Sequence, residues 1–191
     1  SITVPAYAAG IIDTEKDVQL TIAYKQDEAA ISGAKFDIYK VADVDAYAQM
    51  TLTNRFSGYP IAFDDLDQSD WDVLALTLKG YVWSDSLSAD VSGETDAAGN
   101  MQAVLKPGLY LVIGYRRTIG ETTYSATPFM VFLPGSNTEQ NTWDYAVTAY
   151  PKVDGEKNPS DDPNDKLISR KVLKIWDDAK KESSRPQEIT V

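Results

Sequence analysis

The sequence predicts an all-β fold, a β-sandwich that carries one inserted α-helix and is followed by part of a second β-sandwich domain. Three observations support this. Short stretches of alternating apolar and polar residues recur between polar turns, one stretch has helical spacing instead, and the composition changes after residue 153. The chain has 191 residues, enough for one full domain and part of another.

Alternating, β-branched and aromatic residues predict the strands in chain order. Residues 18–22 and 34–41 form the first two, joined by a polar loop at 25–28. Residues 95–100 have the composition of a turn. The later strands are predicted at residues 101–105, 109–115, 122–133 and 143–150, with a loop at 134–142.

The helix is predicted at residues 70–83. Its apolar side chains recur three and four residues apart: Trp71, Leu74, Ala75, Leu78, Tyr81 and Val82. Asp65, Asp67 and Ser69 precede it as candidate capping residues and first-turn acids. We expect the apolar stripe to pack in the core rather than to bind a ligand.

The composition excludes several classes of protein. The chain has no cysteine and no histidine, which removes Ser–His and Cys–His nucleophiles, disulfides, and zinc sites built on these ligands. Its formal net charge is −11, so nucleic acid is not an expected partner. The sequence predicts no catalytic residues, no metal and no cofactor, and we expect that the protein is not an enzyme.

The first residues resemble the end of a signal peptide. Ala6 and Ala8 stand in the small-x-small pattern that signal peptidase cuts, which makes residues 1–8 a signal-peptide remnant and Ala9 the mature start. A chance alanine-rich start is the alternative. No apolar stretch approaches the roughly 20 residues of a membrane helix, so the mature form is expected outside the membrane.

Residues 154–165 are predicted to be a linker, because they contain prolines and many charges without apolar periodicity. Their acids lack the spacing of a calcium loop. Alternation resumes at 167–176, so residues 166–191 are predicted to be the truncated start of a second domain. The N-terminal domain is then 9–153.

A motif stands at the end of this first domain. It consists of Trp143, Val147, Tyr150, Pro151 and Lys152. Trp143 and Tyr150 are expected to anchor the strand by packing. It resembles the pilin motif of Gram-positive backbone pilins, a Trp followed by Val-x-Val-Tyr-Pro-Lys, with an alanine in place of the second valine.

Other segments resemble the same family. Residues 172–178 and 185–191 are similar to the opening hairpin of a collagen-adhesin B-type (Cna B) domain, and 31–41 and 107–112 resemble its recurring strands. The resemblance implies immunoglobulin-like sandwiches. It identifies the chain as similar to a sortase-assembled backbone (major or shaft) pilin.

The resemblance implies a structural function. A pilin-specific class C sortase would join Lys152, as acyl acceptor, to the sorting-signal threonine of a neighbouring subunit through an isopeptide bond. The attacking amine must be deprotonated, whereas an ordinary lysine is almost fully protonated near pH 7. The expected location is a pilus, or fimbria, at the cell wall of the organism that secretes it.

The family's domains usually carry an internal isopeptide between a lysine and an asparagine, assisted by an acid. By resemblance these positions fall on Tyr24, Val153 and Gly114, so we expect no internal isopeptide in the first domain, with Lys25 as the alternative lysine. In the second domain Lys174 stands at the isopeptide lysine position.

Two rival functions stay open. The first is a cell-wall-anchored adhesin or a minor (tip or basal) pilin, which would bind host matrix or glycan, with residues 45–92 as the candidate binding face. The second is a secreted enzyme that uses carboxylates, as glycosidases do. Asp64, Asp65, Asp67 and Asp70 are better explained as acids at the start of a helix.

Overall fold

The computed structural model describes residues 10–159, which belong to two compact units. The first unit contains residues 10–117 and 124–155, and the second contains the described residues 118–123 and 156–159. The predictions for residues 1–8 and 166–191, including Lys174, lie outside the described residues. The first unit carries the helix, Lys152 and the two sheets that are described next.

The main sheet of the first unit is antiparallel throughout, with the order β11-β8-β4-β5. Strands β5 and β6 pair with opposite ends of β4: β6 with its beginning and β5 with its end. The bounds are β4 Lys35–Val44, β5 Met50–Leu52, β6 Val91–Glu94, β8 Gly108–Gly114 and β11 Phe129–Leu133. Strand β4 is therefore the central strand, and it is also the longest of them.

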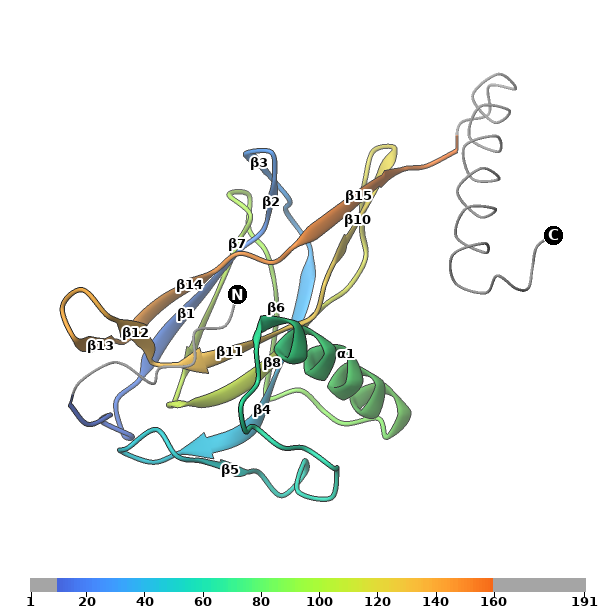
Figure 1. The fold of residues 1–191 in the computed structure, drawn as a ribbon. Helices are drawn as coiled ribbons and strands as arrows, with labels where there is room; N and C mark the ends of the chain where they lie inside the picture. Colours follow the sequence, from blue (N-terminus) through green and yellow to red (C-terminus); the bar gives the residue numbers. More distant parts are fainter. Residues whose placement is uncertain (1–9, 160–191) are drawn as a thin grey trace. The chain divides into compact units, whose positions relative to one another are not determined.

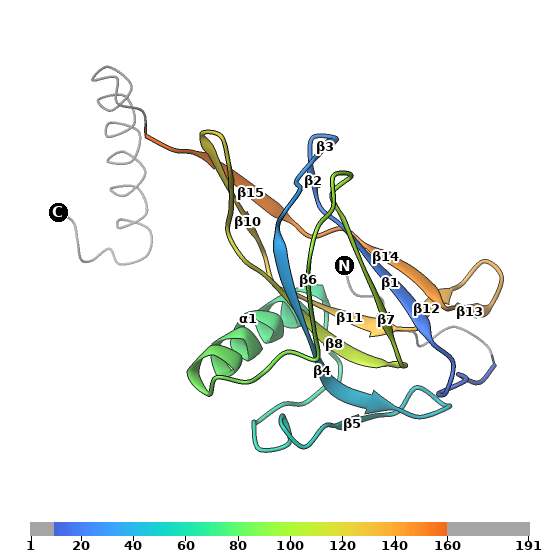
Figure 2. The ribbon, with the colours of Figure 1, turned by 180° about the vertical axis from the view of Figure 1, so that it is seen from behind.

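A second sheet has the order β14-β1-β7 (Figures 1 and 2). The bounds are β1 Val18–Ala23, β7 Asn100–Leu105 and β14 Ala146–Ala149. Strand β1 pairs antiparallel with β7 and parallel with β14, so that Leu20 lies opposite Val147. Segments from both ends of the domain thus meet in one sheet.

The two sheets share an apolar core, which we call the inner core. Every second residue of β1, Val18, Leu20 and Ile22, is buried in it, as period-two alternation predicts. The main sheet contributes side chains such as Phe36 and Val112. The all-β sandwich that the sequence predicts is confirmed.

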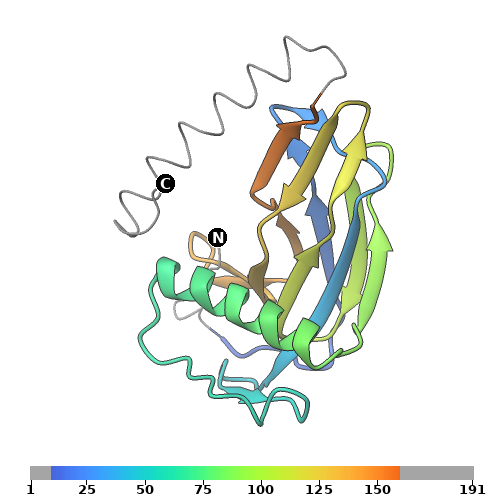
Figure 3. The ribbon, with the colours of Figure 1, turned by 90° about the vertical axis from the view of Figure 1, so that its right-hand side faces the viewer.

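Helix α1, Gln68–Ser84, covers the other face of the main sheet (Figure 3). Asp67 is its N-cap: the Asp67 carboxylate accepts from the Asp70 N–H at 2.8 Å, and the Asp70 carboxylate accepts from the Asp67 N–H at 3.1 Å. This capping box stabilises the first turn. The helix buries Trp71, Ala75, Leu78 and Val82, as the spacing predicts.

These helical side chains form the outer core together with the main sheet. Strand β8 is buried on both faces, because Tyr110 and Val112 enter the inner core while Leu109, Leu111 and Ile113 enter the outer core. The strand therefore reads as a continuous apolar run. The first unit has three layers: sheet, sheet and helix.

The remaining strands are short. Strands β2 and β3 form a hairpin whose two turn residues, Asp27 and Glu28, have positive φ, as a type I′ turn requires. Strands β12 and β13 form another hairpin, and β9, β10 and β15 pair in the order β15-β10-β9. The bounds are β2 Lys25–Gln26, β3 Ala29–Ala30, β9 Arg117–Ile119, β10 Thr122–Ala126, β12 Gly135–Asn137, β13 Thr142–Asp144 and β15 Val153–Lys157.

The structure corrects several predicted boundaries. The strand predicted at 122–133 is interrupted at Thr127 and Pro128, and proline has no N–H for a sheet ladder. The strand predicted at 143–150 is divided at Tyr145, and the loop predicted at 134–142 contains β12. The linker predicted from residue 154 begins inside β15, which ends at Lys157.

Candidate functional site

Lys152 lies between β14 and β15, at the end of the sandwich sheet. The preceding Pro151 is buried, and its ring restricts the backbone. The Lys152 carbonyl accepts a hydrogen bond from the Thr127 N–H at 3.0 Å. The backbone at Lys152 is therefore held on both sides, whereas its side chain is exposed.

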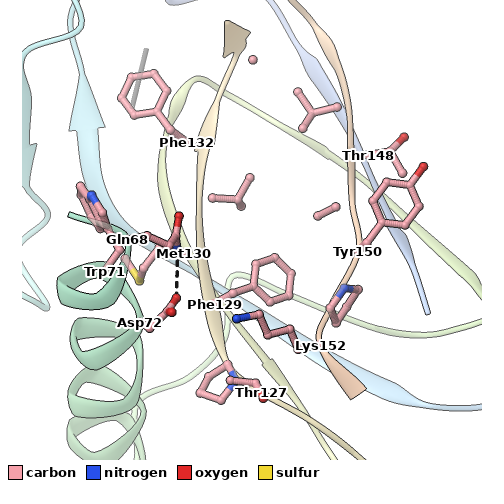
Figure 4. A pocket seen from close by; sticks show the side chains of 16 residues that line it. Gln68, Trp71, Asp72, Thr127, Phe129, Met130, Phe132, Thr148, Tyr150 and Lys152 are labelled. Carbon is pink, nitrogen blue, oxygen red and sulfur yellow. Dashed lines mark hydrogen bonds between the residues drawn. The ribbon is translucent and has the colours of Figure 1, made fainter. Parts of the chain in front are cut away.

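The side chain of Lys152 lines a cavity of about 320 Å³. Three segments of the first unit form its wall: the beginning of α1, the segment that contains β11, and β14 with the residues after it. Figure 4 shows Lys152 reaching from the β14 side beside Phe129 and Thr127, with its nitrogen directed toward the helix. The Lys152 side chain therefore has open space beside it.

The lining is mostly neutral and apolar. Its aromatic and aliphatic part includes Trp71, Phe129, Met130, Phe132 and Val147. The indole N–H of Trp71 is buried and has no hydrogen-bond partner within residues 10–159. The cavity can therefore accept an apolar group.

Two charged residues line the cavity, Lys152 and Asp72. Asp72 stands on α1, four residues after Gln68, and its Oδ1 accepts from the Gln68 Nε2 at 3.0 Å. Figure 4 shows this bond as the dashed line. Asp72 and Gln68 were not among the residues predicted from the sequence, where an acid inside a helix looks like an ordinary surface residue.

Trp143 and Val147 of the predicted motif support the strands around the site. The Trp143 ring stacks on Phe132, with 6.3 Å between ring centroids, and its indole N–H donates to the Gly10 carbonyl at 3.2 Å. Val147 packs against the inner core. The packing expected of Trp143 is confirmed.

Tyr150 corrects an expectation. Together with Trp143 it was expected to anchor the strand by packing, but its side chain is 72% exposed. Residues alternate across β14, and Val147 and Ala149 face inward, so Tyr150 points outward. Tyr150 lines the cavity beside Lys152 without contributing a buried side chain to the core.

The three positions assigned by resemblance to an internal isopeptide lie in or against the packed inner core. Tyr24 is fully buried and meets Phe36 edge to face, with 5.1 Å between centroids. A Cβ at Gly114 would lie 2.7 Å from the same Phe36 ring, and Val153 packs against this core. Phe36 thus takes the space that an acid at position 114 would need.

Lys25, the alternative lysine, does not enter that core. It stands in β2 directly after Tyr24, and its side chain is exposed. Successive side chains of an extended strand point to opposite sides, so the burial of Tyr24 places Lys25 outside. The internal isopeptide therefore stays a predicted absence, and Lys174 lies outside the described residues.

The predicted insertion, 45–92, contains β5 and α1. Its acids at the start of the helix have the expected role in part: Asp67 and Asp70 form the capping box. Three apolar side chains of α1 face outward, Val73 at 59%, Leu76 at 55% and Trp83 at 55% exposure. We call these three residues the outer helix stripe.

Within residues 10–159, no group of three or more acidic residues is arranged to hold a metal ion. No helix in the same part of the chain is long and apolar enough to cross a membrane.

Comparisons with known proteins extend this description. No protein-family model and no curated protein sequence matches the chain. Among solved structures, the SpaE basal pilin from Lactobacillus rhamnosus GG is similar, with a TM-score of 0.50, 12% identity, and coverage of 73% of this chain and 49% of that one.

Two further pilin structures match. The full-length major pilin SpaD from Corynebacterium diphtheriae has a TM-score of 0.45 and 23% identity, and the match covers 74% of this chain and 31% of that one. A mutant of the shaft pilin SpaA from Lactobacillus rhamnosus GG has a TM-score of 0.44 and 17% identity, with 75% and 49% coverage.

The chain spans between about a third and a half of the length of these pilins. The match to SpaE, at low sequence identity, is a likeness of fold. It agrees with the strands and the single helix described above, which form a β-sandwich of the kind found in Cna B-like domains. The chain therefore has a pilin-like fold.

Proposed function

We propose that this protein is a structural subunit of a covalently polymerised cell-surface pilus, with Lys152 as the acyl acceptor. One observation carries the proposal: Lys152 stands on a fixed backbone at the edge of a cavity. Polymerisation requires a lysine that a second protein can reach. An exposed side chain with space beside it meets this requirement.

The reaction proposed is transfer of an acyl group from sulfur to nitrogen. A sortase holds a neighbouring subunit as a thioester through the threonine of its sorting signal. The neutral Lys152 Nζ attacks the thioester carbonyl, the carbon–nitrogen bond forms and the carbon–sulfur bond breaks. One amine proton leaves with the sulfur, and an isopeptide remains. The pilin supplies the amine, and the chemistry belongs to the sortase.

The partners follow from this reaction. We infer a class C sortase, neighbouring copies of the subunit and a location at the cell wall of a Gram-positive organism, in a pilus. In this role the chain is not an enzyme. The domains proposed are 9–153 as the N-terminal pilin domain, 154–165 as the linker, whose first residues belong to β15, and 166–191 as the start of a Cna B-type domain.

A second candidate is a minor (tip or basal) pilin or an adhesin that binds host matrix or glycan. The outer helix stripe favours it, because three large apolar side chains face solvent within the 45–92 insertion. In that case Lys152 is not joined in chains of subunits, and variants of Val73, Leu76 and Trp83 lose ligand binding.

The proposal is tested by Lys152→Arg in cells that assemble the pilus. Arginine keeps the charge and much of the length of lysine but does not act as an amine nucleophile. We expect the ladder of high-mass polymers on a denaturing gel to disappear. Lys25→Arg is the matched control, since Lys25 is exposed and lies away from the cavity. An unchanged ladder in Lys152→Arg would refute the proposal.

A further inference from the structure

We propose that Asp72 is a positioning residue for Lys152: its carboxylate draws the lysine amine into the cavity, toward the place where the acyl group arrives. This inference rests on the proposed function for its purpose. The attraction between the two side chains is a property of the folded domain and can be measured without a sortase.

The charges that line the cavity are the first support for this role of Asp72. Its lining contains one cation, Lys152, and one anion, Asp72, among otherwise neutral residues. The two stand on opposite sides, one after β14 and the other on α1, and Figure 4 shows the lysine nitrogen directed toward the helix that bears Asp72. Attraction between opposite charges is screened less beside apolar walls than in open water.

The second support is that the Asp72 carboxylate is itself held in place by its neighbours. Its Oδ1 is held by the Gln68 amide at 3.0 Å, one helical turn earlier. Helix α1 is itself fixed by the capping box at Asp67 and by Trp71, which is buried at 4% exposure. The carboxylate is therefore held in place, whereas a lysine side chain has many rotamers to lose.

The third support is that the Lys152 amine and the Asp72 carboxylate are separated. None of the ion pairs within residues 10–159 includes Lys152 or Asp72. A closed ion pair would hold the amine against the carboxylate and would have to break before attack. Across an open cavity, the carboxylate orients the side chain and leaves the nitrogen available to the acyl carbon.

The first experiment measures the order of the Lys152 side chain by NMR relaxation of its methylene groups. In the native protein we expect Lys152 to be more ordered than Lys25, an exposed lysine outside the cavity. Asp72→Asn lowers the order of Lys152 to that of Lys25, and Asp72→Glu retains it. Equal mobility of Lys152 and Lys25 in the native protein would overturn the inference.

The second experiment measures the rate at which a class C sortase joins Lys152 to a peptide that carries the sorting signal. Asp72→Asn is expected to lower this rate about tenfold, and less at high salt, where screening already weakens the attraction. Asp72→Glu recovers most of the rate. Asp64→Asn, which removes an exposed acid outside the cavity lining, is the control and leaves the rate unchanged.

The two experiments separate the two proposals. An ordered Lys152 that depends on Asp72 but is not joined by the sortase would refute the proposed function and support the positioning of Lys152 by Asp72. Joining at Lys152 that is equally fast in Asp72→Asn would refute the positioning role alone. An unchanged melting temperature in Asp72→Asn shows that a lower rate does not arise from a damaged fold.

Discussion

At the scale of single residues, the phenol groups of two tyrosines differ in the partners available to them. The Tyr24 hydroxyl is buried and has no hydrogen-bond partner within the described residues, whereas the Tyr115 hydroxyl donates to the buried Asp37 carboxylate at 2.7 Å. Burial raises the pKa of Tyr24 to about 12, and the hydrogen bond to Asp37 is the largest cause that raises the pKa of Tyr115 to about 12.

Tyr24→Phe is therefore expected to increase the free energy of unfolding by up to about 1 kcal/mol, because it removes an unsatisfied buried hydroxyl without changing the ring. Tyr115→Phe, the matched control, decreases it by roughly 1–3 kcal/mol because Asp37 loses a donor. Urea denaturation of both variants measures the difference. A Tyr24→Phe protein that is clearly less stable would show that the hydroxyl has a partner.

The raised pKa of Tyr24 also predicts a dependence of stability on pH. The folded protein favours the neutral phenol of Tyr24. The stability that this preference contributes is fully present below pH 10. It is lost between pH 10 and pH 12, because the phenol ionises in the unfolded chain before it ionises in the folded protein. Between these values the native protein should lose stability more steeply than Tyr24→Phe. Equal slopes would contradict the assigned pKa.

Trp143 and Tyr150 form a second contrast within the predicted motif. Trp143→Ala removes the stacking on Phe132 and the hydrogen bond to Gly10, at a cost of about 2 kcal/mol for a partly buried tryptophan. Tyr150→Ala removes an exposed ring and should change stability by less than about 0.5 kcal/mol. Thermal unfolding compares them, and a large loss in Tyr150→Ala would contradict the outward position of this ring.

At the scale of elements, two glycines are expected to respond in opposite ways to an added methyl group. Gly99 lies in the turn between β6 and β7, and Gly80 lies in helix α1. Gly99 has a φ of +81°, and a Cβ there would lie 2.5 Å from the Tyr24 carbonyl oxygen. Gly80 lies inside α1 with nothing within 4 Å of such a Cβ. The turn requires its glycine, and the helix does not.

Gly99→Ala is accordingly expected to destabilise the domain by about 1–3 kcal/mol through backbone strain and the close contact. Gly80→Ala is expected to stabilise it by about 1 kcal/mol, since alanine favours a helix interior over glycine. Both variants are compared with the native protein by calorimetry. We expect the melting temperature to fall in Gly99→Ala and to rise in Gly80→Ala. A change of the same sign in both variants would contradict the structure described around one of the two glycines.

The elements also show how far the sequence predicts the structure. Strands β1, β4 and β7 and helix α1 were found because their apolar residues keep one period over six or more residues, and β8 was found as a continuous apolar run after Pro107. Strands β5, β6, β9 and β12 have three or four residues, too few for a period to appear. Their pairing depends on tertiary contacts that no local pattern contains.

Only one side of the candidate site, the side that bears Lys152, was predictable from the sequence. The motif at residues 143–152 pointed to Lys152, because the type and spacing of its residues resemble a known pattern. The opposite wall was not predictable, since Asp72 lines the same cavity as Lys152 only when α1 packs on the main sheet. The exposure of Tyr150 was missed because tyrosine suits both a core and a surface.

At the scale of the whole molecule, the domain holds together without disulfides, because the chain has no cysteine. The inner core contains Tyr24 and Phe36, and Val153 packs against it; Tyr24 and Val153 stand at positions that were assigned by resemblance to an internal cross-link. We expect intact-domain mass spectrometry to give the full mass of residues 9–153, without the loss of one ammonia. A peptide pair from this range, linked with that loss, would contradict the prediction.

Intermolecular linkage through Lys152 is the central claim, and it is tested most directly on assembled fibres. Fibres released from the cell wall are digested, and branched peptides are sequenced by mass spectrometry. The expected result is a peptide in which the Lys152 Nζ is joined to the threonine carbonyl of a neighbouring subunit's sorting signal. Fibres in which every Lys152 is unmodified would contradict the claim.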